Sequence, residues 1–171
     1  MTVSPEILRP AYAGTRLTLA AGYTAPRAIA AVSTNVFVAP SSGTFIVQKI
    51  DTSTSPFAVS ATSAALTTAA RAMVAMTNLA TPAILVATDA TPAKIYSLKQ
   101  SDLTLIGAAL TLDAGEGPVT RLSYDGTYAY ALVGAAPGRV VAIDPVGGGA
   151  TPIRSSAITL NAGENNPRGI T

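Results

Sequence analysis

The stretch TLAAGYTAPRAIA, residues 18–30, returns near the other end of the sequence as TLNAGENNPRGIT, residues 159–171. The two copies match without a gap at Thr, Leu, Ala, Gly, Pro, Arg and Ile, and they start 141 residues apart, about three units of 47. A third copy, TLDAGEGPVTRLS (111–123), starts 48 residues before the last, and a degenerate one, LTTAARAMVAM (66–76), keeps the apolar start and the Arg. Self-similarity at a fixed period of this size indicates a protein built from structural repeats.

The remainder of each unit repeats as well. The Arg-containing segment is followed by an apolar run, then by a second run after a polar or Gly/Pro break, and then by a third run rich in Ser, Thr and Ala. The first runs are NVFVAP (35–40), AILVAT (83–88) and YALVGA (130–135); the second are TFIVQKID (44–51), AKIYSLK (93–99) and GRVVAID (138–144); the third are PFAVSATSAALT (56–67), LTLIGAALTL (103–112) and IRSSAITL (153–160).

These runs have the character of half-buried strands. Each is short, contains β-branched residues, and is bounded by Gly, Pro, Asn or Asp. Together with the Arg-led strand, they predict four antiparallel strands in each unit. The Asp125-Gly126 pair is expected at a hairpin tip, where the backbone needs a positive φ.

Residues 57–80 allow a second interpretation. The segment is rich in Ala, and its Leu, Met and Ala residues can be placed on one face of a helix. Against a helix stand the many Ser and Thr residues, Pro56 and Pro82 at the ends, and the register with the strand segments of the other units. Strands are therefore expected here as well.

Three motifs carry a family resemblance: NNPRGIT (165–171), SYDGTYAYALV (123–133) and GRVVAID (138–144). They resemble the degenerate blades of β-propellers with YVTN- and NHL-type repeats, in which a Pro-Arg-Gly-Ile-type start opens the innermost strand. The resemblance covers nearly the whole chain from Leu17 onward and implies an all-β, propeller-like array of four-stranded antiparallel blades. Neither a WD dipeptide nor a kelch double glycine is present. Such blades occur in binding proteins, enzymes and structural proteins alike, so the resemblance implies a fold and not a function.

The expected array is incomplete. After an N-terminal arm of residues 1–16, the repeat domain of residues 17–171 is expected to hold three complete blades, with a partial blade at each terminus. The complete blades span about 27–69, 71–114 and 119–162, and the partial ones 17–20 and 163–171. Three blades do not close a ring, because closed propellers have at least about four. Completion is expected from the terminal segments of the chain, from another copy, or from further repeats of a longer array.

Composition excludes several classes of function. The 171 residues include no Cys and no His, which removes disulfides, thiolate nucleophiles, Cys-ligated metal sites and the usual acid–base group at neutral pH. Eleven basic and nine acidic residues give a net charge of +2, and no two Lys or Arg are adjacent, so nucleic acid is not an expected partner. No segment has about 18 continuous apolar residues, and the start MTVSPEILRP lacks the pattern of a signal peptide. Neither a membrane span nor a cleavable leader is expected.

The repeated arginines are the first candidate site. If each begins an innermost strand, Arg27, Arg71, Arg121 and Arg168 would ring one mouth of a central channel, where they would suit anions or the acidic loops of a partner. The alternative is a structural role, in which each Arg bonds carbonyl groups or a neighbouring blade.

The two AGE loops are the second candidate site. Glu116 and Glu164 occupy the same place in these loops, where they could meet a cation or the hydroxyl groups of a ligand. Tyr23 stands there in the first copy, so a ring of identical calcium ligands is not expected. The other carboxylates are expected to cap turns. No catalytic residue, metal ion or cofactor is assigned.

The expected function is that of a non-enzymatic structural or assembly protein. Only 12% of the residues are charged, and Ser, Thr and Ala dominate, which suits a surface covered by other subunits in a homo-oligomer or larger assembly. With the incomplete array, this favours a component of a phage-like virion, such as a tail, fibre or capsid-decorating protein. The alternative is a carbohydrate- or ligand-binding propeller of the lectin or adhesin kind, extracellular or at a cell surface.

Overall fold

The computed structural model describes residues 17, 19, 23–148 and 151–170, and every regular element in these ranges is a β-strand. The helix considered for residues 57–80 does not form, since that stretch holds strands β4 (Ala58–Thr62) and β5 (Ala70–Met76). The all-β prediction is therefore confirmed. The arm of residues 1–16 and half of the partial blade expected at 17–20 lie outside the described residues.

Within the described residues, the strands form three four-stranded antiparallel sheets, each ordered along the chain. The first sheet consists of β1 (Tyr23–Val32), β2 (Asn35–Gly43), β3 (Gln48–Asp51) and β4. The second consists of β5, β6 (Ala83–Thr88), β7 (Lys94–Lys99) and β8 (Leu110–Thr111). The third consists of β9 (Val119–Tyr124), β10 (Ala129–Val133), β11 (Arg139–Gly148) and β12 (Thr151–Thr159).

The third and fourth strands depart most from the expected segments. β8 has only two residues in place of the run expected over 103–112, because Leu103 and Gly107 have φ angles of 62° and 65°, which an extended strand does not allow. β3 begins at Gln48 and not at residue 44. Just before it, the N–H of Val47 is donated to the Oγ of Ser63 (2.9 Å).

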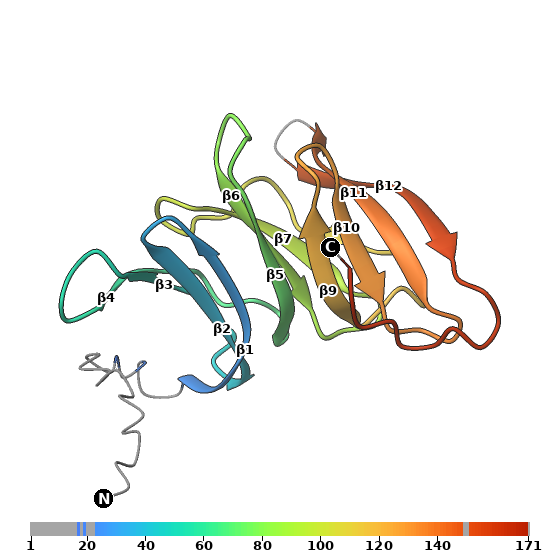
Figure 1. The fold of residues 1–171 in the computed structure, drawn as a ribbon, viewed down its shortest axis with the longest axis horizontal. Helices are drawn as coiled ribbons and strands as arrows, with labels where there is room; N and C mark the ends of the chain where they lie inside the picture. Colours follow the sequence, from blue (N-terminus) through green and yellow to red (C-terminus); the bar gives the residue numbers. More distant parts are fainter. Residues whose placement is uncertain (1–16, 18, 20–22, 149–150, 171) are drawn as a thin grey trace, which may run out of the picture.

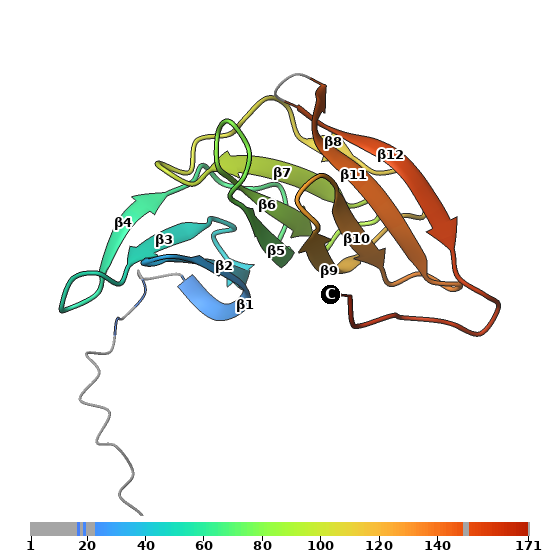
Figure 2. The same cartoon turned by 45° about the horizontal axis from the view of Figure 1, so that its top comes forward.

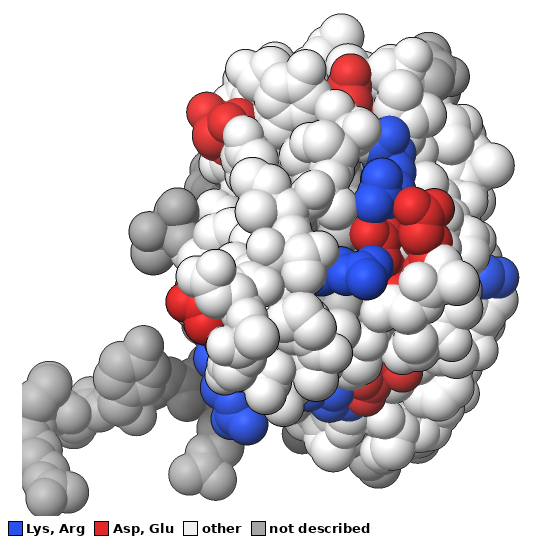
Figure 3. Space-filling view, turned by 90° about the vertical axis from the view of Figure 1, so that its right-hand side faces the viewer, with Lys and Arg blue, Asp and Glu red and all other residues white. Residues whose placement is uncertain are grey.

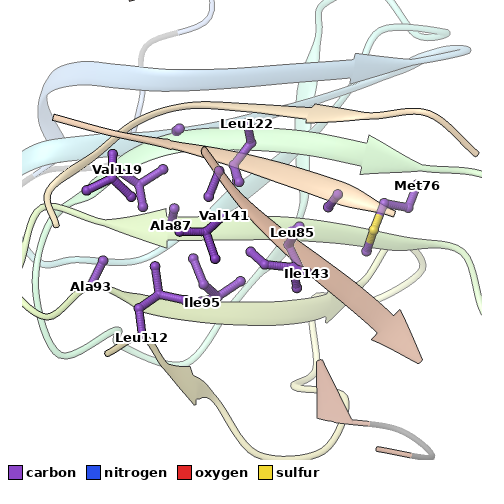
Figure 4. Close-up of a cluster of buried hydrophobic side chains, with 14 of the residues drawn as sticks. Met76, Leu85, Ala87, Ala93, Ile95, Leu112, Val119, Leu122, Val141 and Ile143 are labelled. Atoms are coloured by element: carbon purple, nitrogen blue, oxygen red, sulfur yellow. The ribbon is translucent and has the colours of Figure 1, made fainter. Parts of the chain in front are cut away.

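The three sheets stack face to face in chain order. Their first strands, β1, β5 and β9, lie side by side on the concave side of an arch, and the fourth strands lie towards its convex side (Figures 1 and 2). One apolar cluster, which includes Phe37 and Ile84, separates the first and second sheets. A second cluster, which includes Leu85, Ile95 and Ile143, separates the second and third sheets (Figure 4). Because the second sheet has a neighbour on each face, all six residues of β6 are buried.

Each end of this stack presents an outer face with apolar side chains. The outer face of the first sheet, here called the rear face, carries Ile29, Val36, Val38, Ile50 and Val59. The outer face of the third sheet, here called the front face, carries Tyr130, Leu132, Val140 and Ile158. Leu17 and Leu19 pack on part of the rear face. Coverage of both faces is partial, since Ile29 on the rear face is 66% exposed and Ile158 on the front face is 69% exposed.

Candidate functional site

A β-bulge in each first strand sets the direction of the repeated arginines. The pairing of β1 with β2 skips Arg27, and the pairing of β5 with β6 skips Arg71, so each arginine is the extra residue of its strand. A bulge bends the strand and re-aims the side chain that it carries. The two bulges thus place Arg27 and Arg71 alike, at corresponding points of neighbouring sheets.

The third sheet differs from this pattern by one residue. The residue skipped in the pairing of β9 with β10 is Thr120, and Arg121 occupies the place that Ala28 and Ala72 hold in the other sheets. The expectation of equivalent arginines is therefore not met at Arg121. The physical reason is an insertion in the sequence, because two residues, Val119 and Thr120, separate Pro118 from Arg121, whereas Pro and Arg are adjacent in the first and last copies.

The four repeated arginines nevertheless meet at one place. Together with Thr120, they line a hollow of about 220 Å³ among the first strands, here called the arginine hollow. A second hollow, of about 300 Å³, is also lined by Arg27, Arg71 and Arg121 and runs along the apolar side chains of Ile29 and Met73.

The C-terminal segment brings Arg168 to the arginine hollow. The Oγ1 of Thr120 donates a hydrogen bond to the carbonyl of Pro167 (2.8 Å), and the N–H of Gly138 donates one to the carbonyl of Glu164 (2.8 Å). The segment therefore runs beside the third sheet, and the residues that match the start of another repeat lie next to β9. This contact also covers part of the front face, where Leu132 is only 3% exposed.

The arginine hollow is only partly neutralised. Arg27 and Arg71 both form ion pairs with Asp89, whose Oδ1 lies 2.6 Å from the Nη1 of Arg71. Partial burial raises the pKa of Asp89, but the hydrogen bonds from the two guanidinium groups outweigh it and hold the pKa below its ordinary value. Arg121 and Arg168 are exposed and form no ion pair within the described part of the chain.

Glu116 lies in a different environment, because its side chain is fully buried between the second and third sheets. Its Oε2 accepts a hydrogen bond from the Nε of Arg154 (2.9 Å), and its Oε1 accepts one from Nη2 of the same residue (2.7 Å). Arg139 lies 3.8 Å away, and Asp113 pairs with Arg154 as well. The hydrogen bonds from Arg154 lower the pKa of Glu116 against the opposing effect of burial. Glu116 is therefore occupied in joining the AGE loop of the second sheet to β11 and β12.

The AGE loops also show why a glutamate recurs in them. Glu116 accepts the N–H of Asp113 (3.1 Å), and Glu164 accepts the N–H of Asn161 (2.7 Å), so each glutamate caps its own turn. The preceding glycines, Gly115 and Gly163, have φ angles of 80° and 94°, where a side chain would be strained. Repetition of the AGE motif thus follows from the turn. Glu116 and Glu164 do not line the arginine hollow.

The remaining surface gives little other chemistry. Figure 3, which looks at the molecule from the side of β12, shows a mostly uncharged surface with a central cluster in which acidic and basic side chains lie against each other. No group of three or more potential metal-ligating side chains occurs among the described residues. None of the described residues belongs to a helix long and apolar enough to cross a membrane.

Sequence reasoning did not single out three of the residues that shape these sites. Asp89 and Thr120 border the repeated arginines, and Arg154 holds the buried carboxylate of Glu116. None of them recurs with the 47-residue period, so the repeat pattern carries no signal for them. No family model matches the chain, and no curated protein matches it.

Proposed function

We propose that the three sheets are blades of a β-propeller-type array, and that the chain is a non-enzymatic structural protein whose copies assemble through the rear and front faces. The fold proposal is supported by the four-stranded sheets in chain order and by their first strands lying side by side. The assembly proposal is supported by the two outer faces, whose side chains repeat those of the faces that pack inside the chain.

The rear face repeats a buried pattern. Counted from the bulge, Ile29 takes the place in β1 that Met73 takes in β5 and Leu122 takes in β9. Met73 and Leu122 are 8% and 9% exposed, because each packs on the preceding sheet, whereas Ile29 is 66% exposed. The rear face therefore has the side chains of a surface that another sheet covers. This is the observation that carries the proposal.

The front face repeats the complementary pattern. Ile158 pairs with Val140 in the third sheet as Leu110 pairs with Ile95 in the second. Ile95 is fully buried and Leu110 is partly buried, because both pack towards the third sheet. Ile158 corresponds to Leu110, but no described sheet packs on the third sheet from this side, and Ile158 is 69% exposed.

The occupant that fits both faces is a second copy of this chain. A rear face is built to receive a front face, so copies would join head to tail, through two different surfaces. Two copies of a three-sheet array joined at both ends would form a ring of six sheets, within the range of four to eight blades of propellers. If the rotation between copies does not close, the same contact produces an open chain of copies.

The mass in solution tests this proposal directly. Light scattering on the 171-residue chain is expected to give twice the monomer mass of 17.2 kDa for a closed ring, or a concentration-dependent series of multiples for an open one. A mass that stays monomeric at high protein concentration would contradict the assembly.

Substitutions then locate the contact. Ile29→Glu on the rear face and Ile158→Glu on the front face are each expected to yield monomers, since a buried unpaired carboxylate is costly. Leu105→Glu is the matched control, because Leu105 is 46% exposed but lies on neither outer face. Dissociation of all three variants alike would refute a specific contact.

Mixing the two face variants tests the head-to-tail arrangement. A pair made of one Ile29→Glu copy and one Ile158→Glu copy keeps one unmodified contact, so the mixture is expected to regain dimers that neither variant forms alone. If like faces paired instead, one of the two variants would remain a dimer by itself. A virion location and the alternative of carbohydrate binding both stay predictions; imaging of labelled particles and a glycan array would test them.

A further inference from the structure

The arginine hollow contains more hydrogen-bond donors than the protein uses. Each guanidinium group has five N–H donors in a planar fork that suits carboxylate and phosphate oxygens. Arg27 and Arg71 each give one nitrogen to Asp89. The Nη1 of Arg121 makes one long contact, 3.5 Å, with the carbonyl of Thr120. Most donors of the four groups therefore face the hollow or solvent.

The charges in the arginine hollow are unbalanced as well. Four guanidinium groups from three sheets and the C-terminal segment meet there, and Asp89 is the acidic side chain that pairs with them among the described residues. Like charges gathered within one hollow repel each other, and a bound anion relieves that repulsion. The Coulomb energy of the site thus favours a ligand with more than one negative charge.

We propose that the arginine hollow is a binding site for a small multivalent oxyanion of the phosphate class. Its volume of about 220 Å³ has room for a diphosphate-sized group. One water molecule takes up roughly 30 Å³ in the liquid, so the volume of the hollow corresponds to about seven water molecules. Bidentate contacts from Arg121 and Arg168 would hold the oxygens, while Arg27 and Arg71 add further positive charge. The lining of the site comes from one chain.

The rest of the surface argues for a small ligand over a nucleic acid. Binding along a phosphate backbone needs an extended track of cations. Here the net charge is only +2, and outside the hollow Arg154 and Arg139 are taken up by Glu116. Among the described residues, the cations that gather in one hollow are thus the four repeated arginines.

Titration with pyrophosphate at constant ionic strength tests the proposal by calorimetry, with sodium chloride as the background. Binding with one site per chain is expected. Arg121→Gln and Arg168→Gln should each weaken it roughly 5- to 10-fold, as expected for the loss of one charged hydrogen-bonding group that is partly screened by solvent. The matched control is Lys94→Gln, which removes the same charge from β7, outside the hollow.

The substitution Asp89→Asn is expected to change the affinity for pyrophosphate in the opposite direction. Removing this carboxylate releases Arg27 and Arg71, so pyrophosphate is expected to bind more tightly. A purely structural role for the arginines predicts no such gain. The inference is overturned if pyrophosphate gives no heat beyond the salt background, if Lys94→Gln weakens binding as much as Arg121→Gln, or if only an acidic peptide binds. Light scattering on the same samples separates this result from that of the assembly proposal.

Discussion

Replacing Glu116 with glutamine tests whether the buried ion pair joins the second and third sheets. The substitution keeps the size of the side chain but removes its charge and puts an amide N–H₂ where an oxygen faces Arg154. The two arginines that share this carboxylate, Arg154 and the more distant Arg139, then both lose it as a partner. The structure therefore predicts a loss of stability and not merely a local rearrangement.

The size of the loss follows from the exposure of the partners. Breaking a buried ion pair by removing one partner costs about 3–5 kcal/mol when the other charge stays buried. The side chains of Arg154 and Arg139 are 27% and 36% exposed, so they can turn partly towards water, and a loss of about 2–3 kcal/mol is expected. For a chain of this length, that corresponds to a fall of about 4–12 °C in Tm.

Glu164→Gln is the matched control. Glu164 has the same place in its AGE loop and caps the same turn, but it is exposed and has no ion pair within the described residues. Its substitution is expected to change stability by about 1 kcal/mol or less. Thermal unfolding followed by circular dichroism compares the two variants at neutral pH. Equal shifts would refute the reasoning, because they would show that capping alone accounts for the glutamate.

The remaining predictions concern pH and packing. The pKa of Glu116 is lowered from its ordinary 4.5. The stabilising effect of its carboxylate is therefore complete above pH 4.5 and is lost as the pH falls through the lowered pKa. The Tm difference between wild type and Glu116→Gln should shrink in acid. Gly117→Ala would place a Cβ 2.1 Å from the carbonyl oxygen of Ala90, so the free energy of unfolding in urea is expected to fall by about 1–3 kcal/mol. Gly169→Ala is the control, because a Cβ at residue 169 meets open space and should have little effect. Leu85→Ala leaves a cavity in the core and should cost about 2–5 kcal/mol by the same assay.

The sequence predicted the central strands of the fold well, and the outer ones less well. The run AILVAT was predicted as a strand over the same six residues that form β6, because a strand buried on both faces is a continuous apolar run. The hairpin tip at Asp125-Gly126 is also confirmed: Gly126 has a φ of 104°, and Asp125 accepts the N–H groups of Thr127 and Tyr128. β8 was predicted too long, because a leucine within an apolar run gives no indication that Leu103 adopts a left-handed backbone conformation.

The sequence predicted that the four repeated arginines gather, but it predicted neither their geometry nor the Thr120 and Asp89 that lie beside them. The 47-residue period was enough to expect the repeated arginines at one place, because equivalent positions of stacked sheets lie along one line. The displacement of Arg121 by one residue depends on where the bulge falls, and a pattern of residue types does not fix that. Glu116 was grouped with Glu164 by its motif, yet burial separates them: only Glu116 meets Arg154, a partner that comes from β12 and outside the motif.

The same period gives the stack a direction. The leucine before each sheet packs on the face that points to the preceding sheet: Leu66 lies in the cluster between the first and second sheets, Leu112 in the cluster between the second and third, and Leu19 on the rear face. The rear face therefore already holds the linker residue that elsewhere lies between two sheets. In the proposed assembly, a surface that has this residue in place, together with an isoleucine that is two-thirds exposed, would receive a front face and not another rear face. Any partner that covers it should approach in the direction in which the sheets already follow one another.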